Sequence, residues 1–402
     1  MTVTATFDVD RVRDCFPALA DDTSYFDGPG GSQVPRQVAE AVASTLTCGI
    51  ANQGTTTAAE RRASETVSNA RAAAADLLEA DHRGVVFGRS ATQLTFDASR
   101  ALAKQWGPGD EVVVTRLDHD ANIRPWVLAA EAAGATVRWV DFDKETAELG
   151  FDGSVLSERT RLVAVTGASN LLGTRPDVRS IADAVHAAGA LLYVDGVHLT
   201  PHAPVSVLDL GADFYVCSPY KFFGPHLGVL AAEPALLETV RPDKLLPATN
   251  RVPERFELGT LPYEMLAGVT AAVDFMADLA PGDAQDRRGR LVASMRAVEE
   301  QEDALFARLM AGLRDIDGVT TYGEPARRTP TALFDVAGRS GREVYEHLAS
   351  RGVNAPAGSF YALEAARRLG LGDAGAVRAG LAPYTSEADV DRLLTGVAEL
   401  AR

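Results

Sequence analysis

The chain has 402 residues, of which 46% are hydrophobic and 23% charged, and these proportions are typical of a soluble globular protein rather than a disordered or fibrous one. Its net charge of -16 would repel nucleic acid phosphates and anionic membrane surfaces, so we expect no nucleic acid or membrane partner and favour a small-molecule ligand. A chain of this length exceeds what one hydrophobic core usually serves, which predicts two domains with a cleft between them.

The N-terminal segment mixes charged and apolar residues and lacks the continuous apolar run of a signal peptide. We expect residues 1–19 to pack with the smaller domain. No later stretch reaches the length that spans a membrane. The three cysteines, Cys15, Cys48 and Cys217, lack metal-ligand spacing and are odd in number, so neither a metal site nor a disulfide framework is predicted. Together these features predict a cytoplasmic protein.

Short apolar runs alternate with amphipathic stretches between Gly84 and Glu233, which is typical of an α/β domain with a mainly parallel sheet. Most runs are apolar on both faces, as in strands that helices cover on each side. The stretch Pro176 to Ala188 is one predicted helix, and Gln93 to Trp106 is another. The seven predicted strands are residues 84–88, 111–115, 135–140, 161–166, 190–195, 213–217 and 227–232.

Beyond about Asp283 the pattern changes to a long charged helix, roughly Arg290 to Leu313, followed by shorter mixed strands and helices. The segment Leu279 to Arg290 has the Pro, Gly and charge content of a boundary. We therefore predict a large ligand-binding domain at 20–283 and a smaller α+β domain at 284–402.

Lys221 and Asp195 follow or end two predicted strands, at the edge where open α/β sheets bind ligands. Partial burial beside Phe222 and Phe223 would lower the pKa of the Lys221 amine, which could then form an imine with an aldehyde. A loop lysine with its ammonium in solvent is the ordinary alternative. Asp195 needs a partner for its buried carboxylate, and a protonated pyridine nitrogen supplies one, although such aspartates also cap helices.

Three other features follow predicted strands. Ser90, Ala91 and Thr92 begin a helix whose free amides could hold a phosphate, although taken alone they are more often an ordinary helix cap. His119 could lie on an aromatic cofactor and move protons. His198 could donate to a phenolic oxygen on the same ring, or be a turn residue bonded to backbone.

With their surroundings, these residues resemble the class V aminotransferases, specifically their cysteine desulfurase-like branch. Residues 194–230 resemble the signature block of that family, in which a strand-end Asp precedes the Schiff-base Lys by about the spacing found here, 221 − 195 = 26. The resemblance implies a fold type I enzyme that binds pyridoxal phosphate (PLP). Further matching segments, which span nearly the whole chain, are residues 25–35, 118–126, 168–174, 255–260 and 377–394.

The resemblance also implies a role for each matching residue. Lys221 would be the Schiff-base lysine, Asp195 would contact the pyridinium nitrogen, and His119 would stack on the ring and take part in catalysis. His198 stands at the phenolic-oxygen position, where the family usually has Gln.

The remaining implied contacts concern the phosphate and the substrate. Ala91, Thr92 and Ser218 would hold the phosphate, with Tyr220 where relatives commonly have His. Thr260 would reach the phosphate of a neighbouring subunit, which implies a homodimer with shared active sites. Asn170 and Arg378 would receive an amino acid substrate, because a guanidinium binds an α-carboxylate through two hydrogen bonds.

One departure from the family concerns sulfur chemistry. Cysteine desulfurases carry a nucleophilic Cys on a loop of the small domain, but the corresponding stretch here, residues 356–364, has none. Because persulfide formation needs an accessible activated thiol, we expect another outcome of the α-carbanion. We favour β-elimination of the carbon–sulfur lyase type, with transamination or epimerisation as the alternative.

Two alternative functions have less support from the sequence. A nucleotide-dependent oxidoreductase would also have an α/β sheet, but no strand is followed by a G-x-G-x-x-G fingerprint with a downstream acid. A non-catalytic binding protein on the same fold predicts decay at the cofactor positions, and these positions are intact.

Overall fold

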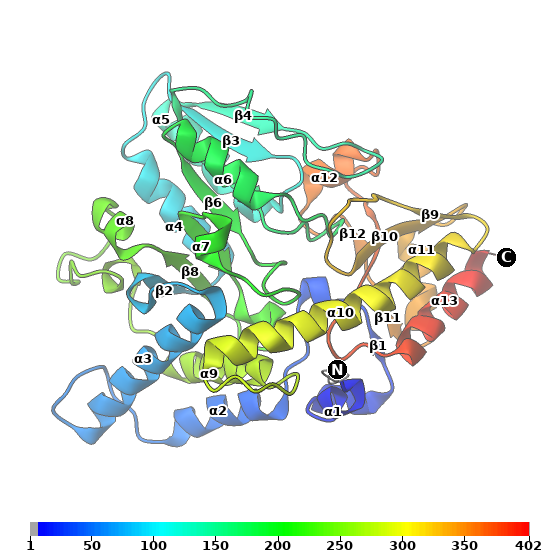
Figure 1. Ribbon diagram of the computed structural model, residues 1–402, viewed down its shortest axis with the longest axis horizontal. Helices are drawn as coiled ribbons and strands as arrows, with labels where there is room; N and C mark the ends of the chain where they lie inside the picture. Colours follow the sequence, from blue (N-terminus) through cyan, green and yellow to red (C-terminus); the bar gives the residue numbers. More distant parts are fainter. Residues whose placement is uncertain (1–6, 402) are drawn as a thin grey trace.

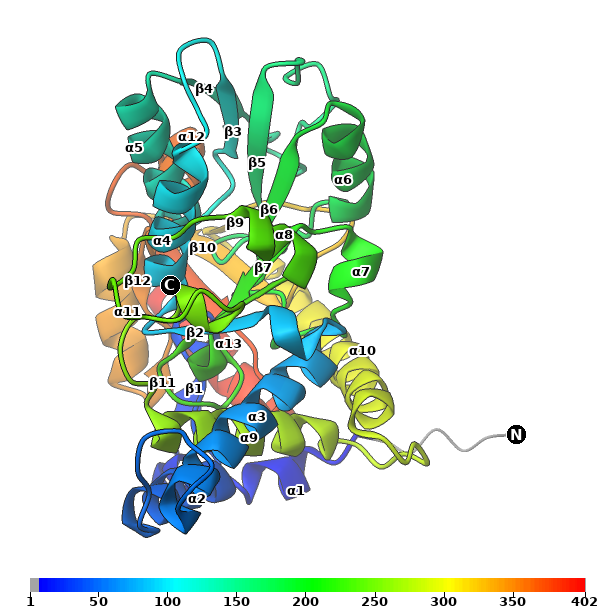
Figure 2. The same ribbon diagram turned by 90° about the vertical axis from the view of Figure 1, so that its left-hand side faces the viewer.

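The computed structural model describes residues 7–401. Its largest element is a seven-stranded sheet with the order β2-β8-β7-β6-β5-β3-β4 (Figures 1 and 2). Of these seven strands only β8 runs antiparallel to its neighbours, so the predicted mainly parallel sheet is confirmed. The strands are β2 (Val85–Gly88), β3 (Glu111–Thr115), β4 (Thr136–Val140), β5 (Thr160–Thr166), β6 (Leu191–Asp195), β7 (Phe214–Cys217) and β8 (Gly228–Ala232).

Helices cover both faces of this sheet, because alternate side chains of the apolar strands point to opposite sides. Val112 and Val114 of β3 pack with α4 and α5, whereas Val113 belongs to the core shared with α3, α6 and α9. Figure 2 shows α4 and α5 on one side of the sheet and α6 on the other. The helices of this part are α2 (Arg36–Thr47), α3 (Ala58–Leu78), α4 (Ala91–Ala103), α5 (Arg124–Ala133), α6 (Val178–Ala187), α7 (Val207–Leu210), α8 (Pro234–Thr239) and α9 (Tyr263–Ala277).

The two predicted helices of this part are present with shifted ends. Helix α4 begins two residues before Gln93, because Ser90 accepts a hydrogen bond from the Gln93 amide and caps the helix at Ala91. Helix α6 begins at Val178 rather than Pro176, because the side chain of Asp177 accepts from the Ser180 amide.

The C-terminal part is built on a four-stranded antiparallel sheet with the order β12-β13-β10-β9. Its core is apolar and separate from the two cores of the large sheet. The elements are β9 (Val319–Thr321), β10 (Thr331–Val336), α11 (Gly341–Ala349), β11 (Val353–Asn354), β12 (Ala357–Gly358), α12 (Leu363–Arg368), β13 (Ala376–Gly380) and α13 (Glu387–Ala401).

Helix α10 (Arg287–Arg314) confirms the long predicted helix and joins the two parts. Leu291 and Met295 in its first half pack in the core of the large sheet, whereas Leu305 and Leu309 in its second half pack in the C-terminal core. In Figure 1 the helix runs from beside α3 and α9 to beside α13 and β9.

The N-terminal segment contacts both parts of the molecule. In α1 (Val9–Arg13), Arg13 donates to Asp389 at 2.7 Å, and Arg11 donates to the carbonyl of Asp278 at 3.2 Å. Strand β1 (Ser24–Tyr25) pairs in parallel with β11 of the C-terminal part. Residues 1–6 of the predicted segment lie outside the described residues, and the predicted domain limits at 19 and 283 stay predictions.

Residues 7–401 contain neither a membrane-spanning helix nor a metal-binding cluster. Within this range no helix combines the length and the apolar character that crossing a bilayer requires. The same residues contain no group of His, Cys, Asp and Glu side chains arranged to hold a metal ion.

Candidate active site

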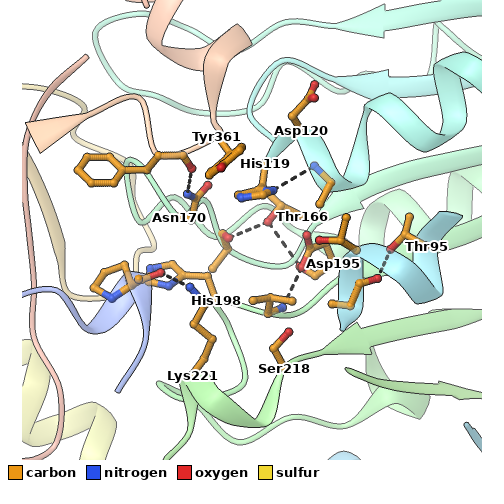
Figure 3. Close-up of a pocket in the computed structure, with 18 of the residues that line it drawn as sticks. Thr95, His119, Asp120, Thr166, Asn170, Asp195, His198, Ser218, Lys221 and Tyr361 are labelled. Carbon is orange, nitrogen blue, oxygen red and sulfur yellow. Dashed lines mark hydrogen bonds between the residues drawn. The ribbon is translucent and has the colours of Figure 1, made fainter. Parts of the chain in front are cut away.

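A cavity of about 660 Å³ lies where the carboxyl ends of β3, β5, β6 and β7 meet residues of the C-terminal part. The chain leaves β3 towards the edge strand β4 and then returns to β5, so the strand order reverses between β3 and β5. Ligands of open α/β sheets bind at such a reversal. Figure 3 shows His119 and Tyr361 at one side of this cavity and Lys221 and Ser218 at the other. The predicted site residues that line it are Ala91, Thr92, His119, Asn170, Asp195, His198, Ser218, Tyr220, Lys221 and Arg378.

Thr260 is the predicted site residue that does not line this cavity. It is exposed on the segment between Glu257 and α9, away from the other site residues of its own chain. The sequence resemblance assigns it to a neighbouring subunit, so its place in the single chain leaves that role as a prediction.

Lys221 ends a single 3₁₀ turn, Pro219–Lys221, which follows the buried strand β7. Its Nζ donates to the carbonyl of Pro29 and lies 4.9 Å from the centre of the Tyr220 ring. Burial and, secondarily, the Arg378 guanidinium lower the pKa of Lys221 to about 7, against the opposing effect of Asp195. Much of this amine is therefore neutral near pH 7 and able to act as a nucleophile or base.

Asp195 ends β6 and has a largely buried carboxylate. Its Oδ1 accepts from the backbone amide of Val197 at 2.9 Å. Burial raises the pKa of Asp195 to about 6, opposed by that hydrogen bond and by Lys221. A cationic ligand group beside this carboxylate would favour its ionised form, as the predicted pyridinium contact requires.

His119 is held in one neutral tautomer by the backbone of the turn Asp120–Asn122. The amide of Ala121 donates to its Nδ1 at 3.0 Å, which places the proton on Nε2. Burial, followed by Lys221 and Arg378, lowers the pKa of His119 to about 4. The imidazole is therefore neutral and planar at the cavity wall, which suits contact with an aromatic ring.

Asp118 anchors the segment that carries His119 and was not identified from the sequence. It is fully buried, accepts from Asn122 Nδ2 at 2.7 Å and also accepts from Thr115. Burial raises the pKa of Asp118 to about 8. The only sequence signal for Asp118 was its position directly before His119 at the end of a strand. Its burial and its two side-chain donors depend on the tertiary structure and could not be predicted from local sequence.

The start of α4 forms the end of the cavity predicted to hold a phosphate. Ala91 and Thr92 line it, and Ser218 reaches it from the turn after β7. Gly228 of β8 lies against this helix start, where a Cβ would approach Ser90 and Ala91 backbone atoms to between 2.4 and 2.7 Å. A glycine is therefore needed at 228 for the helix start to lie this close to the sheet.

Arg378 and Asn170 come from different parts of the chain and meet in the cavity. Arg378, in β13, is 2% exposed and donates through Nη1 to the carbonyl of Asn170 at 2.9 Å. Its guanidinium carbon lies 3.7 Å from the centre of the Phe360 ring. Burial lowers its pKa to about 9, opposed by Asp27. Arg378 Nε and Asn170 Oδ1 have no partner among the described residues, so both have free hydrogen-bonding capacity for a ligand.

The loop at 356–364 covers the cavity with two aromatic residues that sequence reasoning did not identify as site residues. Phe360 and Tyr361 have φ values of +52° and +58°, a conformation that non-glycine residues seldom adopt. Asn170 Nδ2 donates to the Phe360 carbonyl at 2.9 Å, and the Asp120 amide donates to the Tyr361 carbonyl at 2.7 Å. These contacts hold the strained loop against the large part of the molecule.

Among the described residues, no cysteine lines the cavity. Cys217 is buried in the sheet, and burial raises the pKa of its thiol to about 12. Cys15 is partly exposed and Cys48 is exposed, both outside the cavity. The structure therefore places no activated thiol at the site.

The residues present fit pyridoxal phosphate. A lysine of lowered pKa, a buried strand-end carboxylate and a neutral imidazole line one cavity. The buried Nδ1 of His198 has no partner among residues 7–401 and belongs to the same lining. An aldehyde, a pyridine nitrogen, an aromatic ring and an oxygen acceptor on one molecule would satisfy these four groups.

Comparison with known proteins agrees with this geometry. An uncharacterised protein of Mycobacterium tuberculosis is 34% identical over 98% of this chain and 99% of its own. Aminotransferase-like protein FGM3 of Gibberella zeae is 33% identical over 98% of both chains. The crystal structure of the cysteine desulfurase CsdA of Escherichia coli is 27% identical over 98% of both chains, with a TM-score of 0.86. The model of the class V aminotransferase family matches residues 24–393, and the chain therefore belongs to this family of PLP-dependent enzymes.

Proposed function

We propose that the protein is a carbon–sulfur lyase that removes a sulfur substituent from the β-carbon of an L-amino acid without forming a protein persulfide. The main support for this proposal is the lining of the cavity. Phe360 and Tyr361 of the loop at 356–364 line it, and no described residue of the lining is a cysteine. The likeness to a cysteine desulfurase over nearly the whole chain supports a substrate with sulfur at this carbon.

Lys221 is the proposed anchor of the cofactor and the base of the reaction. When bound, pyridoxal phosphate supplies an electron sink for the charge that develops at the substrate's α-carbon. The Lys221 amine would accept the α-proton, because its lowered pKa leaves much of it unprotonated near neutrality. With the cofactor bound, Asp195 would favour a protonated ring nitrogen, and His119 would contact the ring. Ala91, Thr92, Ser218 and Tyr220 would hold the phosphate.

Substrate orientation is assigned to Arg378 and Asn170. The guanidinium has a free Nε and is held over the Phe360 ring, so it can receive an α-carboxylate without moving. Asn170 already donates to the loop carbonyl of Phe360 and keeps its Oδ1 free. Substrate binding therefore takes place between the two parts of the chain.

The elimination step breaks two bonds of the substrate, Cα–H and Cβ–S. Lys221 takes the α-proton, the electron pair of that C–H bond forms the Cα–Cβ double bond, and the electron pair of the Cβ–S bond leaves with sulfur as a thiolate. Water then hydrolyses the released enamine to a keto acid and ammonia. No thiol of the protein and no oxidant takes part.

We further propose that the protein is a cytoplasmic homodimer in which Thr260 reaches the partner's phosphate site. The segment before Thr260 exposes large apolar side chains, with Leu245, Leu246 and Leu258 exposed by 70%, 97% and 55%. Large apolar side chains exposed in one segment are consistent with an association surface.

The test is product analysis with the PLP-loaded enzyme on L-cysteine, cystine and S-substituted cysteines. We expect the sulfur product, keto acid and ammonia in equal amounts, where the sulfur product is sulfide from L-cysteine, thiocysteine from cystine and a thiol from an S-substituted cysteine. Rates should be unchanged in a variant carrying Cys15→Ser, Cys48→Ser and Cys217→Ala. Sulfur release that stops in this cysteine-free variant would overturn the proposal. Amino transfer to an added keto acid, without thiol release, would instead establish the transaminase alternative.

A further inference from the structure

His198 has one ring nitrogen bonded within the protein and one left free at the cavity. Its Nε2 lies 2.9 Å from Thr331 Oγ1. Its Nδ1 is buried and has no partner among residues 7–401, although the residue lines the cavity. Thr331 belongs to β10 of the C-terminal part and is 0% exposed, so this hydrogen bond joins the two parts behind the cavity.

The hydroxyl of Thr331 has His198 as its only described hydrogen-bond partner. If Nε2 carried the imidazole proton and donated to this hydroxyl, the hydroxyl hydrogen would be buried without an acceptor. If the hydroxyl donates to Nε2, the imidazole proton lies on Nδ1, and every group behind the ring is satisfied. Because buried polar groups are rarely left unpaired, the second arrangement has the lower free energy.

The ring of His198 is also fixed from behind by a buried contact between His202 and Glu302. The ring of His202 meets it edge to face, with centres 5.1 Å apart, and His202 Nδ1 lies 2.8 Å from Glu302 Oε2 of α10. Burial, followed by the neighbouring titratable groups His202, Arg378 and Lys221, lowers the pKa of His198 well below its usual range. The imidazole is therefore neutral, and the position of its single proton decides whether it donates or accepts.

We propose that Thr331 sets the tautomer of His198, so that Nδ1 carries the proton and donates it in a hydrogen bond to the phenolic oxygen of bound cofactor. The inference rests on the proposed placement of PLP in this cavity. A glutamine at 198 would donate through its amide in any setting, whereas a neutral histidine donates through Nδ1 only in the tautomer whose Nε2 carries no proton. Thr331 is thus a positioning residue, and it is required because position 198 is a histidine, whose tautomer must be fixed.

The first experiment compares Thr331→Val with Thr174→Val in the PLP-loaded protein. Thr174 is also 0% exposed and its hydroxyl has no described partner, so its variant controls for loss of a buried hydroxyl. We expect Thr331→Val to raise the pH midpoint of the visible cofactor absorbance by about one unit, because the phenolic oxygen loses its donor and retains the shared proton more tightly. Thr174→Val and Thr331→Ser are expected to titrate as the parent does.

The second experiment repeats Thr331→Val in a His198→Gln background. Since an amide has no tautomer to set, the valine substitution is expected to leave the midpoint unchanged there, and the two shifts are not additive. An unchanged midpoint in the single Thr331→Val variant, or an equal shift in both backgrounds, would overturn the tautomer proposal alone. A parent protein that gains no visible absorbance with PLP would instead remove the proposed function on which it rests.

Discussion

The two sides of the cavity are built in different ways. Asp195 ends a buried strand, and Lys221 ends the short turn that directly follows another, so the sheet largely determines the position of each side chain. Phe360 and Tyr361 lie on a loop with left-handed backbone, held by hydrogen bonds from Asn170 and Asp120. The side chains proposed to hold the cofactor are therefore positioned by the sheet, whereas those proposed to orient the substrate depend on contacts between the two parts of the chain.

The strongest test of the strand-end side is Lys221→Ala. We expect turnover to fall by a factor on the order of 10³ or more, because the proposed covalent anchor and the base are both lost. Lys104→Ala, at an exposed lysine paired with Asp243, is the matched control and should retain activity. Steady-state kinetics and the visible spectrum measure the effect, and near-parental turnover in the alanine variant would contradict the assignment.

Asp195→Asn tests the same side with a smaller expected effect. An amide cannot stabilise a protonated ring nitrogen as a carboxylate does, so we expect kcat to fall by about 10²-fold with little change in protein stability. The control is Asp209→Asn on the exposed side of α7. A kcat within twofold of the parent would show that Asp195 only caps the turn through Val197.

Phe360→Ala tests the loop side. Loss of the ring removes the surface on which the Arg378 guanidinium lies, so we expect KM for the amino acid to rise by about tenfold with kcat little changed. Phe360→Tyr keeps the aromatic face and is expected to keep the parental KM. A fall in kcat at constant KM would place Phe360 in the chemical step and not in substrate orientation.

The smallest expected effect concerns the stability of the cofactor-free protein. The pKa of Lys221 is about 7 in the folded state and near 10.5 as a free side chain, so the unfolded state binds more protons between these values. The lysine therefore destabilises the fold fully below about pH 7, and the penalty disappears as pH rises towards 10.5. Lys221→Met should raise the melting temperature by about 1–3 °C at pH 7 and by less at pH 10. An equal gain at both pH values would contradict the lowered pKa.

Much of the strand-end side was predictable from the sequence. Continuous apolar runs identify buried strands, and a polar residue at the end of such a run lies at the binding edge of the sheet. Asp195 and Lys221 were identified in this way, and their spacing supported the family resemblance. The roles assigned to individual site residues stay predictions until the variants above are measured.

The loop side was not predictable to the same degree, because its contacts join residues far apart in the chain. Neither left-handed residue, Phe360 or Tyr361, is a glycine or an asparagine, and their conformation depends on Asn170 and Asp120. The pairing of His198 with Thr331 spans 133 residues. Local pattern identified that histidine as a candidate but gave no sign of its partner.

Helix α10 has a consequence for how the molecule unfolds. Leu291 and Leu309 lie on one uninterrupted helix and belong to different cores. Melting the helix at either end removes apolar side chains from the adjoining core, so loss of one core weakens the other through a shared backbone. Denaturant titration is therefore expected to give a single transition, with fluorescence and helical content changing together, despite the presence of separate cores.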